Sequence, residues 1–144
     1  MKLLVAVDLS PITEIYIKKF SEINFISKSD IWLVHVVPPD PDFVGYEVGP
    51  QTERDFIAKK FQEKHRELQQ LASKMKSKNM KVTPLLLQGP TVETIFDAAE
   101  KMNPDIIVTG SHGHGMMYNF FVGSISKEIL GKSKRPVLII PVRD

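Results

Sequence analysis

Short, continuous runs of apolar residues alternate along this chain with longer segments that have the period of a helix. Each run is bounded by polar residues, glycine or proline, as expected of strands that are covered on both faces in a parallel sheet. This alternation constrains the fold more than any other feature, because parallel strands must be joined by crossover segments. The runs predict five strands, over residues 3–7, 31–37, 82–87, 105–110 and 136–142.

Four helices are predicted between these strands. The first has apolar residues at spacings of four, four and three, a serine placed to cap it and a proline in its first turn. The third follows Gly89 and Pro90, with Thr91 as its cap, and the fourth runs from Gly123 or Ser124 to about residue 131. The residues that define the first are Ser10, Pro11, Ile12, Tyr16, Phe20 and Ile23, and those of the long second helix are Ile57, Phe61, Leu68, Leu71 and Met75.

The order of these elements predicts a three-layer, doubly wound α/β fold. Right-handed crossovers place helices on both faces of a five-stranded parallel sheet, a Rossmann-like arrangement with strand order 3-2-1-4-5. A chain of 144 residues has the usual size of one domain, so residues 1–144 are expected to form a single domain. The stretch 38–50 carries four prolines and two glycines and could be a lid or a surface loop.

Charge and cysteine content argue against several classes of function. Lys and Arg exceed Asp and Glu by only 19 to 17, and both signs are interleaved, so no nucleic-acid partner is expected. The chain has no cysteine, which excludes disulfides, thiolate metal sites and a cysteine nucleophile. The apolar start is too short for a signal peptide or a membrane span and breaks at Asp8. We expect a cytoplasmic protein with no membrane contact.

A ligand site is expected at the carboxyl ends of the strands, where the strand order of an open α/β sheet reverses. The glycine-rich stretch 110–126 follows the fourth strand and leads into a helix. Glycines let backbone N–H groups approach an anion, and a helix start adds unpaired donors and a positive dipole end. This combination suits phosphates. The alternative is that Gly110 and Gly113 only turn the chain and that Gly123 only starts a helix.

The spacing of these glycines resembles the ATP-binding signature of the universal stress protein family. Gly110 is followed after two residues by Gly113, and after nine more by Gly123 and Ser124. The resemblance extends along the chain, to residues 5–8, 33–37, 89–91 and 135–142. It implies membership in the branch of the family that keeps the glycine pattern and binds ATP, with Mg²⁺ held through the phosphates and no metal ligand from the protein.

The resemblance also implies a role for each matching residue. Asp8 would accept a hydrogen bond from the ribose or the adenine, and Val36 would line the adenine slot. Gly110 and Gly113 would flank the ribose and the first phosphates, while the last phosphates would lie at the start of the fourth helix. The implied nucleotide-binding residues are Asp8, Val36, Gly110, Ser111, His112, Gly113, Gly123, Ser124, Ile125 and Ser126.

Two other functions stay open. No general base for attack on the γ-phosphate is evident, so we expect a nucleotide-binding regulatory module of the stress response and no enzyme. A true ATPase or phosphotransferase would need Asp8 or His112 to position water or polarise a phosphate. A nucleotide-free interaction domain would use the glycines only structurally. His112 and His114 are too few ligands for a metal site.

Three further residues or segments have a structural interpretation. His35, in the middle of an apolar strand, is interpreted as a hydrogen-bonded core histidine, and Asp8 could instead cap the first helix. The strand from Val137 to Val142 is an apolar edge, which predicts a homodimer through antiparallel pairing of two copies. Pro136 and Pro141 weaken that prediction, because proline also protects an edge without a partner.

Overall fold

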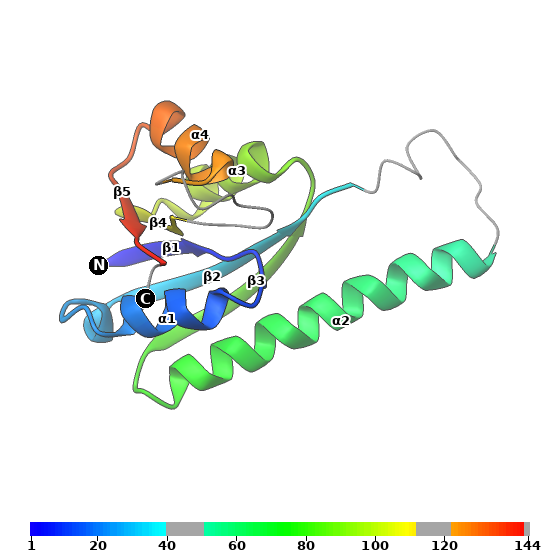
Figure 1. The fold of residues 1–144 in the computed structure, drawn as a ribbon, viewed down its shortest axis with the longest axis horizontal. Helices are drawn as coiled ribbons and strands as arrows, with labels where there is room; N and C mark the ends of the chain where they lie inside the picture. Colours follow the sequence, from blue (N-terminus) through cyan, green and yellow to red (C-terminus); the bar gives the residue numbers. More distant parts are fainter. Residues whose placement is uncertain (40–50, 112–121, 143–144) are drawn as a thin grey trace.

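The computed structural model describes residues 1–39, 51–111 and 122–142. Five parallel strands form one sheet in the order β3-β2-β1-β4-β5, which confirms the predicted fold (Figure 1). The strands are β1 Lys2–Ala6, β2 Asp30–Val37, β3 Lys81–Gln88, β4 Ile106–Gly110 and β5 Val137–Ile140. The helices are α1 Thr13–Ser21, the short 3-10 helix η1 Ile26–Lys28, α2 Gln51–Lys76, α3 Thr91–Met102 and α4 Ser124–Lys132.

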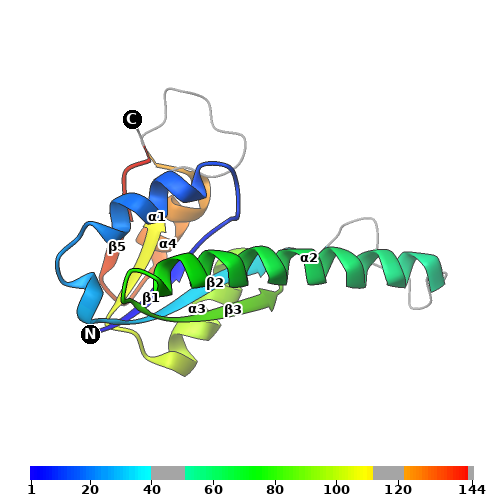
Figure 2. The same ribbon diagram turned by 90° about the horizontal axis from the view of Figure 1, so that it is seen from below.

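The two faces of the sheet each build a separate core, because successive side chains of a strand point to opposite faces. In β1, Leu3 and Val5 pack with α1 and α2, while Leu4 packs with α3 and α4. Each continuous apolar run of the sequence therefore supplies side chains to both cores. Figures 1 and 2 show α1 and α2 on one face of the sheet and α3 and α4 on the other.

Helix α2 is longer than the sheet that it covers. Its last turns are buried through Leu68, Leu71, Ala72 and Met75. Its first turns extend past the ends of the strands (Figures 1 and 2), and Phe56 there is 62% exposed. None of the helices in the described part of the chain is both long enough and apolar enough to cross a membrane.

The predicted caps of α1 and α3 are wrong. Helix α1 begins at Thr13, and Ser10 instead lies in a turn in which its N–H donates to Asp8 Oδ1 at 3.0 Å. Such a side-chain turn competes with capping because it satisfies the backbone locally. Thr91 is the first residue of α3 and not its cap, since the Pro90 carbonyl already accepts the first helical hydrogen bond from Thr94 N at 2.9 Å.

Candidate functional site

A cavity of about 560 Å³ lies at the carboxyl edge of the sheet. It is bordered by the ends of β1, β2 and β4 and by parts of α1, α2, α3 and α4. The strand order reverses between β1 and β4, so the loops that follow these two strands leave toward opposite faces and open a crevice. The cavity therefore lies where the sequence predicted a ligand site.

Most of the predicted site residues border this one cavity. Ser111 is not among the residues that line it. Its backbone and hydroxyl connect the ends of β4 and β5: the N–H donates to Ile140 O and Oγ accepts from Val142 N, both at 2.9 Å. His112 and Gly113 lie outside the described residues. The predicted residues that line the cavity are Asp8, Val36, Gly110, Gly123, Ser124, Ile125 and Ser126.

The two oxygens of the Asp8 carboxylate differ in their hydrogen bonds. Oδ1 accepts hydrogen bonds from Ser10 N and from the Thr13 hydroxyl, each at 3.0 Å. Leu9, between Asp8 and Ser10, adopts a left-handed backbone with φ of 57°. The second oxygen, Oδ2, is buried and has no hydrogen-bond partner among the described residues. Asp8 thus shapes the turn before α1 with one oxygen, while the other oxygen is unpartnered among the described residues.

The start of α4 forms one end of the cavity. Gly123 occupies the N-cap position without a side-chain cap, and its own N–H donates to Ser111 O. The first N–H groups of a helix have no acceptor within the helix, so helix starts such as that of α4 suit an anion. Ser124 is exposed, and Ile125 is 40% exposed. This end of the cavity can bind a phosphate through backbone donors and the Ser124 hydroxyl.

The hydroxyl of Ser126 is used inside the protein. It donates to Gly110 O at 2.6 Å and lies 2.8 Å from the Thr109 hydroxyl, and the whole side chain is buried. These contacts tie α4 to the end of β4. Ser126 therefore lines the cavity, but its hydroxyl is used within the protein and fixes the position of the helix.

Gly110 lies in a closely packed position. A Cβ atom at this position would lie 3.2 Å from Val142 Cγ2 and 3.5 Å from Tyr16 Cγ. The first distance is shorter than ordinary van der Waals contact. The absence of a side chain thus lets the Tyr16 ring and the end of the chain approach the floor of the cavity.

His35 is the hydrogen-bonded core histidine that the sequence predicted, and it also borders the cavity. Its Nδ1 lies 2.8 Å from Val7 O, so Nδ1 carries the proton and donates. Burial lowers the pKa of His35 and the charge of Lys64 adds to this, while the hydrogen bond to Val7 opposes both. The ring is therefore neutral at physiological pH.

Several cavity residues were not predicted. Lys60 and Lys64 reach it from α2, and Tyr16 reaches it from α1. The two lysines are four residues apart and so share one face of a helix. That spacing can be read from the sequence. No local feature of the sequence, however, shows that this face of α2 borders the carboxyl edge of the sheet. Tyr16 was predicted only as part of the buried stripe of the first helix.

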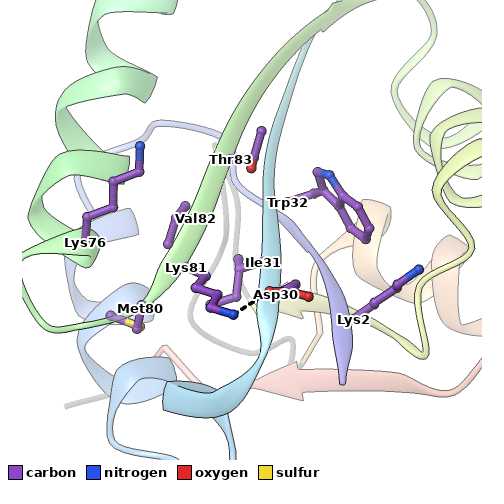
Figure 3. Close-up of a pocket in the computed structure, with 9 residues that line it drawn as sticks. All are labelled: Lys2, Asp30, Ile31, Trp32, Lys76, Met80, Lys81, Val82 and Thr83. Carbon is purple, nitrogen blue, oxygen red and sulfur yellow. Dashed lines mark ion pairs between the residues drawn. The ribbon is translucent and has the colours of Figure 1, made fainter.

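A second hollow of about 580 Å³ lies at the opposite, amino edge of the sheet (Figure 3). Its lining comes from both faces of β2 and β3, since Ile31 belongs to one core and Trp32 packs against the other. Two of its charged groups pair on the surface: Lys81 Nζ lies 3.8 Å from Asp30 Oδ1, with side chains 82% and 59% exposed. No buried side-chain polar atom of the described residues is left without a partner here. This hollow has volume but no converging binding groups.

The doubly wound sheet and the cavity at its switch point define a Rossmann-like class of protein. Residues 1–141 match the model of the universal stress protein family, and the chain belongs to this family. It is 24% identical to the universal stress protein MJ0577 of Methanocaldococcus jannaschii over 96% of this chain and 93% of the relative. The solved structure of MJ0577 has a TM-score of 0.82, with 99% of this chain and 96% of that chain covered.

Two further relatives support this assignment. A universal stress protein of Thermus aquaticus is 30% identical, over 75% of this chain and 74% of the relative. The universal stress protein of Archaeoglobus fulgidus that was solved in complex with dAMP has a TM-score of 0.64 and 21% identity, with 97% of each chain covered. The likeness in structure shows the shared fold, and the dAMP belongs to that protein.

Proposed function

We propose that this protein binds ATP in the cavity at the carboxyl edge and acts as a nucleotide-dependent regulatory module of the stress response. The observation that carries the proposal is the convergence of residues from β1, β2, β4 and α4 on one cavity. Its volume of about 560 Å³ lies within the usual range for small-molecule sites. The adenine nucleotide in the Archaeoglobus fulgidus relative supports the same class of ligand.

The geometry supports a direction for the nucleotide along the cavity. The adenine and ribose lie near Asp8 and the end of β2 at Val36, and the phosphates lie at Gly123 and Ser124, where α4 begins. Lys60 and Lys64 add positive charge to the wall formed by α2. The described residues contain no cluster of three or more metal-ligating side chains. Mg²⁺ commonly binds through phosphates and water, and we propose that it does so here.

We propose binding with at most slow hydrolysis. A general base must reach an attacking water in the correct protonation state. In the direction proposed above, Asp8 and His35 lie with the adenine and ribose at the ends of β1 and β2, whereas the phosphates lie at the start of α4. A turnover rate at or below about one per minute, far under typical enzyme rates, would favour the binding module over a true ATPase.

We also propose that two copies pair through β5. This strand lies at one edge of the sheet, with β4 as its single neighbour in the described chain. Val137, Leu138 and Ile139 are only partly buried there. A strand edge with apolar side chains is a template for pairing with another chain, and symmetric pairs are the commonest oligomers.

The test of ATP binding is the variant Gly123→Val, measured by titration calorimetry. A branched side chain at the N-cap crowds the donors of the first turn of α4, each of which contributes about 1.5–3 kcal/mol to a charged acceptor. Loss of two such bonds weakens binding by more than about 100-fold.

Gly131→Ala is the matched control for this test. Gly131 lies in the last turn of the same helix, where an added Cβ meets nothing within 4 Å. This control should bind ATP like the wild type. Unchanged affinity in a folded Gly123→Val protein would contradict the proposal. Mass spectrometry of the nucleotide that co-purifies with the wild type separates a binding module from a nucleotide-free interaction domain.

A further inference from the structure

The first turn of α4 is joined to the end of β4 by two hydrogen bonds. Gly123 N donates to Ser111 O, and the Ser126 hydroxyl donates to Gly110 O at 2.6 Å. Gly110 and Ser111 are neighbours in the chain, so two successive carbonyl groups at the strand end hold the beginning and the end of one helical turn. These contacts fix the start of the helix to the carboxyl edge of the sheet.

Thr109 adds a third contact to this junction. Its Oγ1 lies 2.8 Å from Ser126 Oγ, and both residues are 5% exposed. Ser126 has one hydroxyl proton, and a carbonyl oxygen cannot donate, so this proton goes to Gly110 O. Thr109 must then be the donor of the 2.8 Å hydrogen bond. Its other contact, with Gly110 O at 3.4 Å, is longer than an O–H···O hydrogen bond normally is.

The hydroxyl of Ser126 is thus held from both sides. It accepts from Thr109 and donates to Gly110 O, which fixes the side chain in one orientation. Both hydroxyls are buried, so water cannot easily replace a lost bond, and a buried polar group without a partner is costly. Thr109 and Ser126 both line the cavity, so the junction forms part of its wall.

The orientation of this turn matters for an anion. Lys127 N donates to Gly123 O at 2.9 Å, and the N–H groups of the three residues before Lys127 precede this first helical hydrogen bond. Donors of this kind stabilise a phosphate when they are preorganised to point at it together. We propose that Thr109 is a positioning residue for the phosphates, because through Ser126 it holds the first turn of α4 in the orientation that binds them. This inference rests on the proposed binding of ATP and assigns to its phosphate end a residue that acts through the helix.

The variant Thr109→Val replaces the hydroxyl by a methyl group of similar size. Oγ1 now lies 2.8 Å from Ser126 Oγ. Because a carbon atom approaches an oxygen only to about 3.3–3.6 Å, Ser126 must move away by about half an ångström or more. The first turn of α4 then moves with Ser126 or loses this contact with the strand. Donors that are displaced in this way bind a phosphate less tightly, whereas the rest of the cavity is unchanged.

Titration calorimetry with ATP and with adenosine tests this inference. Thr109→Val should bind ATP about 10-fold more weakly than the wild type, as expected for the loss of about one hydrogen bond to a charged group. It should bind adenosine, which has no phosphate, within about 2-fold of the wild type, and this also shows that the variant is folded. Thr109→Ser keeps the hydroxyl and should restore ATP binding to within about 3-fold of the wild type.

Thr83→Val is the matched control, because it makes the same chemical change on β3, at an exposed position beside the amino-edge hollow. It should bind ATP and adenosine like the wild type. Three results would overturn the inference and leave the proposed function intact: unchanged ATP binding in Thr109→Val, an equal loss for ATP and adenosine, or no recovery in Thr109→Ser. Absence of ATP binding to the wild type would overturn both the inference and the proposed function.

Discussion

The two edges of the sheet carry hollows of nearly equal volume, about 560 Å³ at the carboxyl edge and about 580 Å³ at the amino edge. They differ in the state of their polar groups. At the carboxyl edge, Asp8 Oδ2 and the Tyr16 hydroxyl are buried without partners. At the amino edge, Lys81 pairs with Asp30 in solvent, and Lys2 N donates to Asp105 Oδ2 at 2.7 Å. Volume alone does not distinguish a site, whereas unpaired polar atoms do.

The parallel sheet gives a physical reason for this difference. Every crossover helix starts near the carboxyl edge and ends near the amino edge, so positive dipole ends gather at one side and negative ends at the other. Lys74 and Lys76 lie in the last turn of α2 and Lys132 in the last turn of α4, where their charge offsets the helix dipole. The amino edge is thus neutralised by its own lysines, and the carboxyl edge is left with donors for an anion.

The largest effect is expected from Gly110→Val, which fills the packed floor of the carboxyl-edge cavity. The first added carbon would lie 3.2 Å from Val142 Cγ2 and 3.5 Å from Tyr16 Cγ, so the larger side chain must displace its neighbours. Overpacking of this kind lowers the free energy of unfolding by about 1–3 kcal/mol. Urea denaturation measures this loss, and calorimetry should show weaker ATP binding because Tyr16 is displaced.

The control for Gly110→Val is again Gly131→Ala. With nothing within 4 Å of the added Cβ, this helical substitution should raise the free energy of unfolding by about 0.5–1 kcal/mol. If Gly110→Val were as stable as the wild type, the floor of the cavity would be loosely packed. The contrast between the two edges would then lose its structural basis.

A smaller effect is expected from the pH dependence that His35 contributes. Its pKa in the folded protein lies below the 6.5 of free histidine, mainly because the ring is buried. As the pH falls below about 6.5, His35 is protonated in the unfolded chain before it is protonated in the folded protein. The contribution of His35 to stability is therefore complete above that pH and is lost as the pH falls through the folded pKa.

The variant His35→Asn removes this titration and keeps a donor for Val7 O. Its free energy of unfolding should fall less than that of the wild type between pH 7.5 and pH 5, as measured by urea denaturation. The charges that face the ring are Lys64 and Glu67 of α2 and Asp8, and they are unchanged in the variant. The control is His65→Asn, which removes a histidine from an exposed position of α2. Equal slopes for all three proteins would show that His35 titrates alike in both states.

The fold could be predicted because its determinants are local and repeated. Continuous apolar runs mark strands that serve two cores, as Leu3 and Leu4 do on opposite faces, and the helical period of Tyr16, Ile17 and Phe20 marks a helix with one buried side. The element ends were less predictable. Before α1, the Ser10 N–H donates to Asp8 Oδ1 in a turn, and Ser10 does not cap the helix. Which of these two arrangements forms depends on details of the backbone that no residue pattern shows.

The candidate site could be predicted only in part, for a related reason. Asp8, Val36 and Gly123 lie on loops or strand ends whose position follows from the topology. Tyr16 and Lys64 reach the cavity only because their helices cross the sheet at particular positions, which is a property of tertiary packing. The sequence also could not show that the Ser126 hydroxyl would donate to Gly110 O and so be used within the protein.

The smallest effects are expected at the amino edge, from Lys81→Met and Asp30→Asn. The pair is 3.8 Å apart with both side chains largely in water, where the attraction of about 1 kcal/mol is offset by the loss of side-chain freedom. Either change should alter the free energy of unfolding by less than about 0.5 kcal/mol and the ATP affinity by less than about 2-fold. A 10-fold weaker affinity in either variant would show that polar groups at this edge also contribute to nucleotide binding. In that case, the presence of unpaired polar atoms would no longer distinguish the hollow that binds nucleotide from the one that does not.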